Sequence, residues 1–95
     1  MNPAQKEKPV VLMVDDEQEI RELAKTYFEE VHGHHFISAN SFDDAVGVIH
    51  DTPGQIVAFI DIHLRGRKSG LDLLRYIQDN ASHRVVAYAF TGEAS

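Results

Sequence analysis

The chain has 95 residues, of which 43% are hydrophobic, and its 15 acidic residues outweigh 9 basic ones to give a net charge of −6. This length supports a single domain, and the acidic balance excludes the basic surface typical of nucleic-acid binding. Cysteine is absent, so the fold cannot depend on disulfides, which suits a cytoplasmic protein. No segment approaches the roughly 20 apolar residues of a membrane span, and we expect a soluble domain.

The first half of the chain predicts an arm, a strand, a helix and a second strand. Residues 1–8 are polar and charged, and we expect a flexible arm there, followed by one domain over 9–95. An apolar run over 10–14 predicts a strand, and helical spacing predicts a helix from Ile20 to Val31. Asp16 and Glu19 resemble a capping box at the start of this helix, and Gly33 is its predicted end.

The second half continues the alternation of strands and helices. After a short strand at 36–39, Ser41 opens a helix that closes near Pro53, and an apolar strand follows at 56–60. A third helix carries Leu71, Leu74 and Ile77 on one face, and residues 85–90 make a fourth strand. Strands that are apolar on both faces need helices on both faces, so this order predicts an α/β fold with a parallel sheet.

Acidic residues follow two of the predicted strands. Asp15 and Asp16 end the first strand and Asp61 ends the third, while Thr91 and Gly92 follow the fourth. Functional residues of open α/β sheets gather at the carboxyl ends of the strands, so neighbouring strands would bring the three carboxylates together. Their repulsion requires a cation or a proton, and a set of oxygen ligands favours Mg²⁺. A hydroxyl and a backbone amide opposite the acids would complete a place for a phosphoryl group.

Each of these residues also has a purely structural interpretation. Asp16 alone could be a helix cap, and Asp61 alone could be a polar residue that ends a strand. The acidic pair, the single aspartate and the Thr-Gly step in this order favour the functional interpretation of the set.

Four stretches of the chain carry a resemblance to a known family. They are Val11 to Asp16 (VLMVDD), Ala58 to Leu64 (AFIDIHL), Ser69 to Leu74 (SGLDLL) and Ala89 to Gly92 (AFTG). Together they resemble the receiver domain of two-component response regulators. The resemblance implies a flavodoxin-like, three-layer parallel sheet of strand order 2-1-3-4. It also implies a truncated receiver, without the last helix, strand and helix of the family.

The same resemblance assigns a function and a role to each site residue. Asp61 would accept a phosphoryl group from a sensor histidine kinase or a phosphotransfer protein, with Thr91 as the switch hydroxyl and Gly92 as an amide donor to the phosphoryl oxygens. The implied Mg²⁺ ligands are Asp15, Asp16, Asp61 and the backbone carbonyl of His63. A module of this kind is a signalling switch and not a turnover enzyme.

The chain departs from the family pattern around its basic residues. Arg65 stands where the family usually has proline, and no lysine follows Lys68 to supply the cation that pairs with the phosphoryl group. We interpret Arg65, Arg67 and Lys68 as a solvated basic turn, with an anion or partner contact as the alternative.

Two other functions stay open at this point. The chain could be a degenerate receiver that acts as a phosphorylation-independent interaction or dimerisation domain. An Mg²⁺-dependent phosphohydrolase is the weaker alternative, because His63 stands where a D-x-D nucleophile motif has its second acid. If the strand at 85–90 is a sheet edge, its apolar residues predict self-association into a homodimer.

Overall fold

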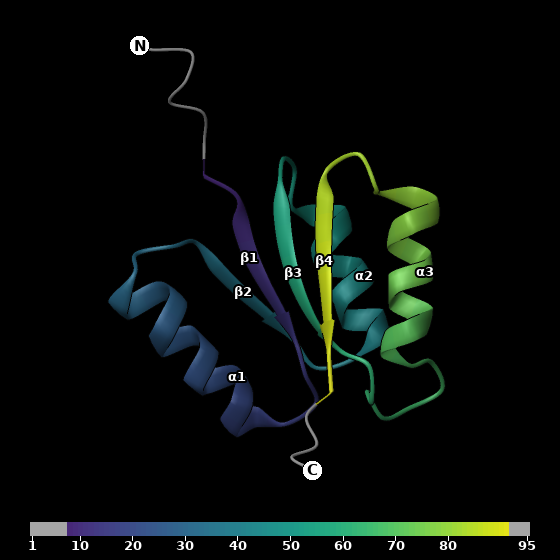
Figure 1. Ribbon diagram of the computed structural model, residues 1–95, viewed down its shortest axis with the longest axis horizontal. Helices are drawn as coiled ribbons and strands as arrows, with labels where there is room; N and C mark the ends of the chain where they lie inside the picture. Colours follow the sequence, from purple (N-terminus) through teal and green to yellow (C-terminus); the bar gives the residue numbers. More distant parts are fainter. Residues whose placement is uncertain (1–7, 92–95) are drawn as a thin grey trace.

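The computed structural model describes residues 8–91, which form a four-stranded parallel sheet with helices on both faces (Figure 1). The strand order β2-β1-β3-β4 confirms the predicted flavodoxin-like topology. Gly92 and all of the expected arm except Lys8 lie outside the described residues. The strands are β1 (Val10–Val14), β2 (Phe36–Ala39), β3 (Ile56–Asp61) and β4 (Val85–Phe90). The helices are α1 (Gln18–Lys25), its π-helical continuation η1 (Thr26–Val31), α2 (Phe42–Asp51) and α3 (Gly70–Asn80).

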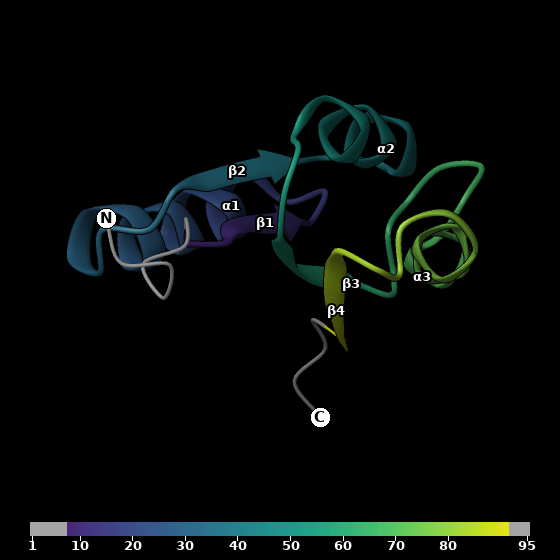
Figure 2. The ribbon, with the colours of Figure 1, turned by 90° about the horizontal axis from the view of Figure 1, so that it is seen from above.

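The main hydrophobic core lies between the sheet and the layer of α2 and α3 (Figure 2). Side chains alternate across each strand, so Leu12 of β1 and Ile60 of β3 point to this face and are fully buried. Ile49 of α2 and Leu73 of α3 close over them and are also fully buried. Full burial of a leucine or isoleucine side chain contributes roughly 1.5–3 kcal/mol, so this layer supplies most of the stability of the fold.

The opposite face of the sheet carries a row of aromatic rings under η1. Phe28 of η1 stacks on Phe36 and Phe59 with ring centroids 6.1 and 5.4 Å apart, and Phe59 stacks on Tyr88 at 5.7 Å. The helix covers β1 and β2, but Tyr88 keeps 56% of its surface exposed. Within residues 8–91, helices therefore cover both faces of the sheet at β1, whereas the face of β4 that carries Tyr88 is partly open.

Two helices begin at serine caps. The Ser41 hydroxyl accepts a hydrogen bond from the Asp44 amide at the start of α2, as predicted. At the start of α3, Ser69 and Asp72 form a capping box in which the Asp72 carboxylate accepts from the Ser69 amide at 2.8 Å. This bond lowers the pKa of Asp72, because it stabilises the ionised carboxylate.

The predicted capping box of the first helix is wrong. The residue that caps α1 is Glu17, whose side chain makes no capping hydrogen bond. Asp16 is instead turned toward the loop that follows β3, where it accepts a hydrogen bond from the Arg65 amide. A contact between residues 49 positions apart in the sequence has replaced the local cap.

The predicted apolar face of α3 is wrong at one position. Leu71 is 59% exposed, whereas Leu73 is fully buried. The reason is the close approach of Gly70 to the end of β3: an added Cβ would lie 2.2 Å from the carbonyl oxygen of Asp61. Only a residue without a Cβ fits there, and this contact sets the rotation of the helix.

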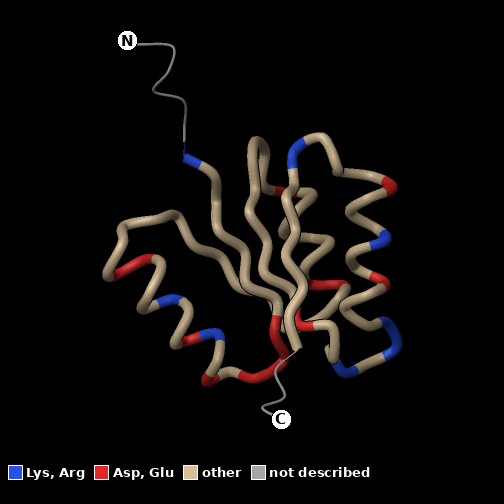
Figure 3. Tube along the Cα trace, in the orientation of Figure 1, with Lys and Arg blue, Asp and Glu red and all other residues tan. Residues whose placement is uncertain are grey.

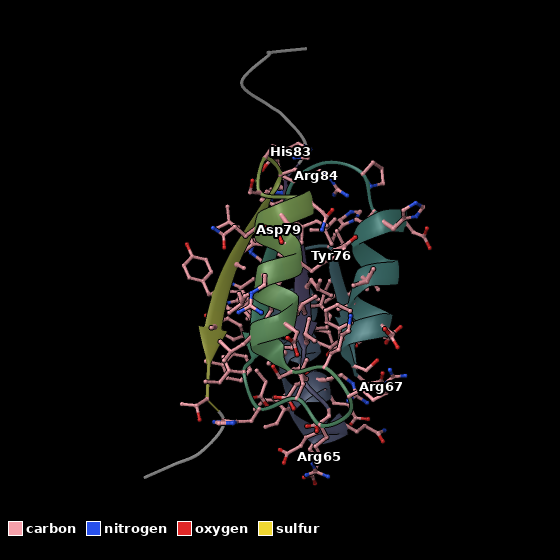
Figure 4. All side chains as sticks on the ribbon, turned by 90° about the vertical axis from the view of Figure 1, so that its right-hand side faces the viewer. Arg65, Arg67, Tyr76, Asp79, His83 and Arg84 are labelled. Carbon is pink, nitrogen blue, oxygen red and sulfur yellow. The ribbon has the colours of Figure 1, made fainter. Side chains whose placement is uncertain are left out.

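Arg84 joins the amino end of β4 to the carboxyl end of α2 (Figure 4). Its guanidinium donates to the backbone carbonyls of Ile49, Thr52 and Gly54 at 2.7, 2.8 and 3.2 Å. A cation at this end of a helix satisfies carbonyls that have no partner within the helix and opposes the negative end of the helix dipole.

Candidate functional site

The three predicted carboxylates meet at the carboxyl ends of β1 and β3. These strands are neighbours, and Val14 pairs with Ile60, so Asp15 and Asp61 follow side by side. One oxygen from each of Asp15, Asp16 and Asp61 lies within 4.8 Å of the others. Figure 3 shows the acidic segments after the two strands coming together, with the basic loop after β3 beside them. The structure thus brings together the acidic residues that the sequence placed at strand ends.

Two of the carboxylates are buried and held by the backbone. Asp15 and Asp61 are only 2% and 7% exposed. The Glu17 amide donates to Oδ1 of Asp15 at 2.8 Å, and the His63 amide donates to Oδ1 of Asp61 at 2.9 Å. Each bond closes a turn of the chain immediately after its strand, so the carboxylate cannot rotate freely.

The electrostatics of the cluster favour binding of a cation. Burial raises the pKa of Asp15, the hydrogen bond from Glu17 opposes this, and the charges of Asp61 and Asp16 raise the pKa further. A raised pKa means that ionisation of Asp15 requires more free energy in the folded protein than in the unfolded chain. A small divalent cation would remove that cost, and three carboxylates without nitrogen or sulfur ligands fit Mg²⁺. The residues present therefore fit this metal.

Asp16 is paired with a basic residue of the loop after β3. The backbone amide of Arg65 donates a hydrogen bond to Oδ2 of Asp16 at 3.2 Å, and its Nε forms an ion pair with the same oxygen at 3.2 Å. The Arg65 side chain is 81% exposed and that of Asp16 only 16%. Sequence reasoning identified a basic turn near the acids but did not predict this pair, because the path of the loop decides which basic side chain returns to the cluster.

A cleft of about 280 Å³ opens over the carboxylates. Besides the three aspartates and Arg65, its lining includes a fourth acid, Glu17, together with Ile20 of α1 and Phe90 of β4, none of which the sequence assigned to the site. Thr91 is exposed at the carboxyl end of β4, and Gly92 lies outside the described residues. His63 also lines the cleft, and the ligand role of its carbonyl stays a prediction.

Solved structures similar to this chain are receiver domains of response regulators, while no family model and no curated protein matches the sequence. A receiver protein from Pseudomonas putida has a TM-score of 0.76 and 24% identity over 95% of this chain and 73% of its own. A CheY-like receiver domain from Methanospirillum hungatei has a TM-score of 0.74 and 28% identity, covering 87% and 64%. The response regulator TrrA from Thermotoga maritima, solved in complex with Mg²⁺ and beryllium fluoride, has a TM-score of 0.71 and 26% identity, covering 88% and 68%.

The fold is therefore that of a CheY-like receiver, with parallel strands in the order 2-1-3-4. These neighbours, together with the motifs at the strand ends, support the identification of the chain as a response-regulator receiver domain. In the part of the chain that the structure describes, no helix is long and apolar enough to cross a membrane.

Proposed function

We propose that this receiver accepts a phosphoryl group on Asp61 in an Mg²⁺-dependent reaction. The observation that carries the proposal is the meeting of three carboxylates, two of them buried, at the end of β1 and β3 in a receiver fold. The Thermotoga maritima regulator was solved with Mg²⁺ and beryllium fluoride, which supports the binding of Mg²⁺ and of a phosphoryl group at the site proposed here.

The proposed chemistry depends mainly on positioning and charge neutralisation, as phosphoryl transfer generally does. When bound, Mg²⁺ would neutralise the carboxylates and the phosphoryl oxygens; Asp15, Asp16 and Asp61 would hold it, with the carbonyl of His63. The His63 amide would keep the Asp61 carboxylate oriented while one oxygen of this carboxylate attacks phosphorus. The bond between phosphorus and the donor's leaving group breaks as the bond to Asp61 forms.

The proposed donor is a sensor histidine kinase or a phosphotransfer protein, the general partners of receiver domains. The product adds roughly −1.5 to −2 charges at one point. Thr91 stands at the end of β4, next to Phe90 in the cleft lining, and we assign to its hydroxyl the role of contacting the phosphoryl oxygens. Gly92 would supply an amide to the same group.

Phosphorylation by acetyl phosphate, read by intact mass, tests this proposal. We expect the protein to gain the mass of one phosphoryl group with Mg²⁺ and to gain none with a chelator. Asp61→Asn is the control, because it keeps the shape of the side chain and removes the nucleophile. A wild-type protein that gains no mass, or an Asp61→Asn variant that gains as much, would contradict the proposal.

Self-association through β4 is a second part of the proposal. Among residues 8–91, β4 pairs only with β3, and its Val86 and Tyr88 are 50% and 56% exposed. Leu23, Tyr27 and Val31 are exposed on the helix of the same face. An unpaired apolar edge is a template for another strand, and a second copy offers the same edge, so we expect a symmetric dimer.

A further inference from the structure

Arg65 is the one arginine or lysine of residues 8–91 that lines the acidic cleft. Its Nε and backbone amide both contact the same oxygen, Oδ2 of Asp16. Asp16 is also one of the three carboxylates that converge within 4.8 Å. The guanidinium therefore offsets part of the negative charge of this cluster at Asp16.

Binding of a metal would break this arrangement. A divalent cation needs the carboxylate oxygens themselves, and its positive charge repels a guanidinium on the same carboxylate. The backbone amide of Arg65 would stay near Asp16, but the side chain, which is 81% exposed, can turn away without disturbing the core. After metal binding the cluster thus holds an arginine without its partner at the mouth of the cleft.

Phosphorylation of Asp61 would give that arginine a new partner. Asp61 lines the same cleft as Arg65, and the phosphoryl group would add about −1.5 to −2 charges there. The planar guanidinium presents several N–H donors in a geometry that matches phosphoryl oxygens, and these charge-assisted hydrogen bonds are among the strongest in proteins.

We propose that Arg65 is the phosphoryl-contacting cation of this receiver and that it exchanges Asp16 for the phosphoryl group on Asp61 when Mg²⁺ binds. This inference rests on the proposed function. A residue of the β3–α3 loop thereby joins the site, and its side chain has opposite effects on two ligands. The Arg65 side chain opposes binding of Mg²⁺ alone and favours binding of a phosphoryl analogue.

Arg67 provides the matched control. It has the same charge and lies two positions further along the same loop. Both arginines line the hollow beside Phe42 and Asp43 of α2, but Arg67 does not line the acidic cleft, whereas Arg65 does. Figure 4 shows the two arginines leaving the loop in different directions, with Arg65 at the end of the molecule and Arg67 beside α2. General electrostatics of the basic loop would affect both variants, whereas the proposed exchange involves Arg65 alone.

The experiment measures the affinities of wild type, Arg65→Gln and Arg67→Gln, first for Mg²⁺ and then for beryllofluoride at saturating Mg²⁺, by NMR titration. For Arg65→Gln we expect Mg²⁺ to bind about two- to fivefold more tightly, the range of an exposed ion pair. Beryllofluoride should bind about tenfold more weakly, as for the loss of a hydrogen bond to a charged group. Arg67→Gln should match wild type in both titrations.

The outcomes separate this inference from the function on which it rests. Wild-type protein that binds neither Mg²⁺ nor beryllofluoride would refute the proposed function. Wild-type protein that binds both, with an Arg65→Gln variant of unchanged or higher affinity for beryllofluoride, would overturn the role of Arg65 alone. Equal effects of Arg65→Gln and Arg67→Gln would also overturn it, because the loop charge would then act without a specific contact.

Discussion

Replacement of Gly70 by alanine tests whether the close contact between Gly70 and the end of β3 positions α3 against the sheet. The new Cβ would lie 2.2 Å from the carbonyl oxygen of Asp61 and 2.6 Å from Cα of Ile62. Ordinary contact begins at 3.4 Å, so the helix or the strand end must move by about 1 Å. Overpacking of this kind costs about 1–3 kcal/mol, and it outweighs the gain of less than about 1 kcal/mol that alanine brings to a helix.

We expect Gly70→Ala to lower the free energy of unfolding by about 1–2 kcal/mol in a urea titration with an unchanged slope. Phosphorylation should also be slower, because the atoms that must move belong to Asp61 and its neighbour. Gly47→Ala in α2 is the matched control: its Cβ meets nothing within 4 Å, so it should raise stability by about 0.5–1 kcal/mol. If both variants are as stable as wild type or more stable, the close approach of Gly70 to Asp61 does not determine the position of α3.

Three further changes probe other parts of the molecule. Arg84→Ala removes three hydrogen bonds to the carboxyl end of α2 and the turn that follows it. It should lower the free energy of unfolding by about 2 kcal/mol; a change below about 0.5 kcal/mol would show that water replaces the guanidinium. Folding raises the pKa of Asp15, which means that the folded state binds the proton of this carboxyl group more tightly than the unfolded state does. The free energy of unfolding of the metal-free protein should therefore fall as the pH rises from 3.8 through the pKa of the folded state. Asp15→Asn should remove this fall. If the free energy of unfolding of the variant falls with pH as steeply as that of wild type, another group causes the effect. Val86→Lys places a charge on the exposed face of β4 and should convert a dimer into a monomer in sedimentation at micromolar concentration; a wild-type monomer would refute self-association.

The order and bounds of the strands could be predicted because their signals are local. The runs at 10–14 and 56–60 are continuous and apolar, which is typical of strands covered on both faces. The convergence of Asp15 and Asp61 follows from the adjacency of these strands, which the resemblance to receiver domains predicts through the strand order 2-1-3-4. Ser41 also acts as the predicted cap, because the partner of its hydroxyl, the Asp44 amide, lies only three residues further along the chain.

The features that sequence reasoning missed depend on contacts between distant segments. The burial of Leu73 in place of Leu71 follows from the approach of Gly70 to Asp61, and helical spacing alone cannot fix the rotation of a helix. The Asp16–Arg65 pair depends on the path of the loop after β3, which no periodicity encodes. The exposure of Tyr88 depends on how far α1 and η1 extend across the sheet.

The central claim is that Asp61 carries the phosphoryl group while Asp15 and Asp16 hold the metal. Borohydride reduces an acyl phosphate to an alcohol and leaves free carboxylates intact, so reduction of the phosphorylated protein followed by peptide mass spectrometry marks the acceptor directly. We expect the reduced side chain at position 61 alone, in amounts that follow the phosphorylated fraction in the intact-mass spectrum. Reduction at position 15 or 16, or a phosphorylated protein with no reduced side chain at 61, would contradict the claim.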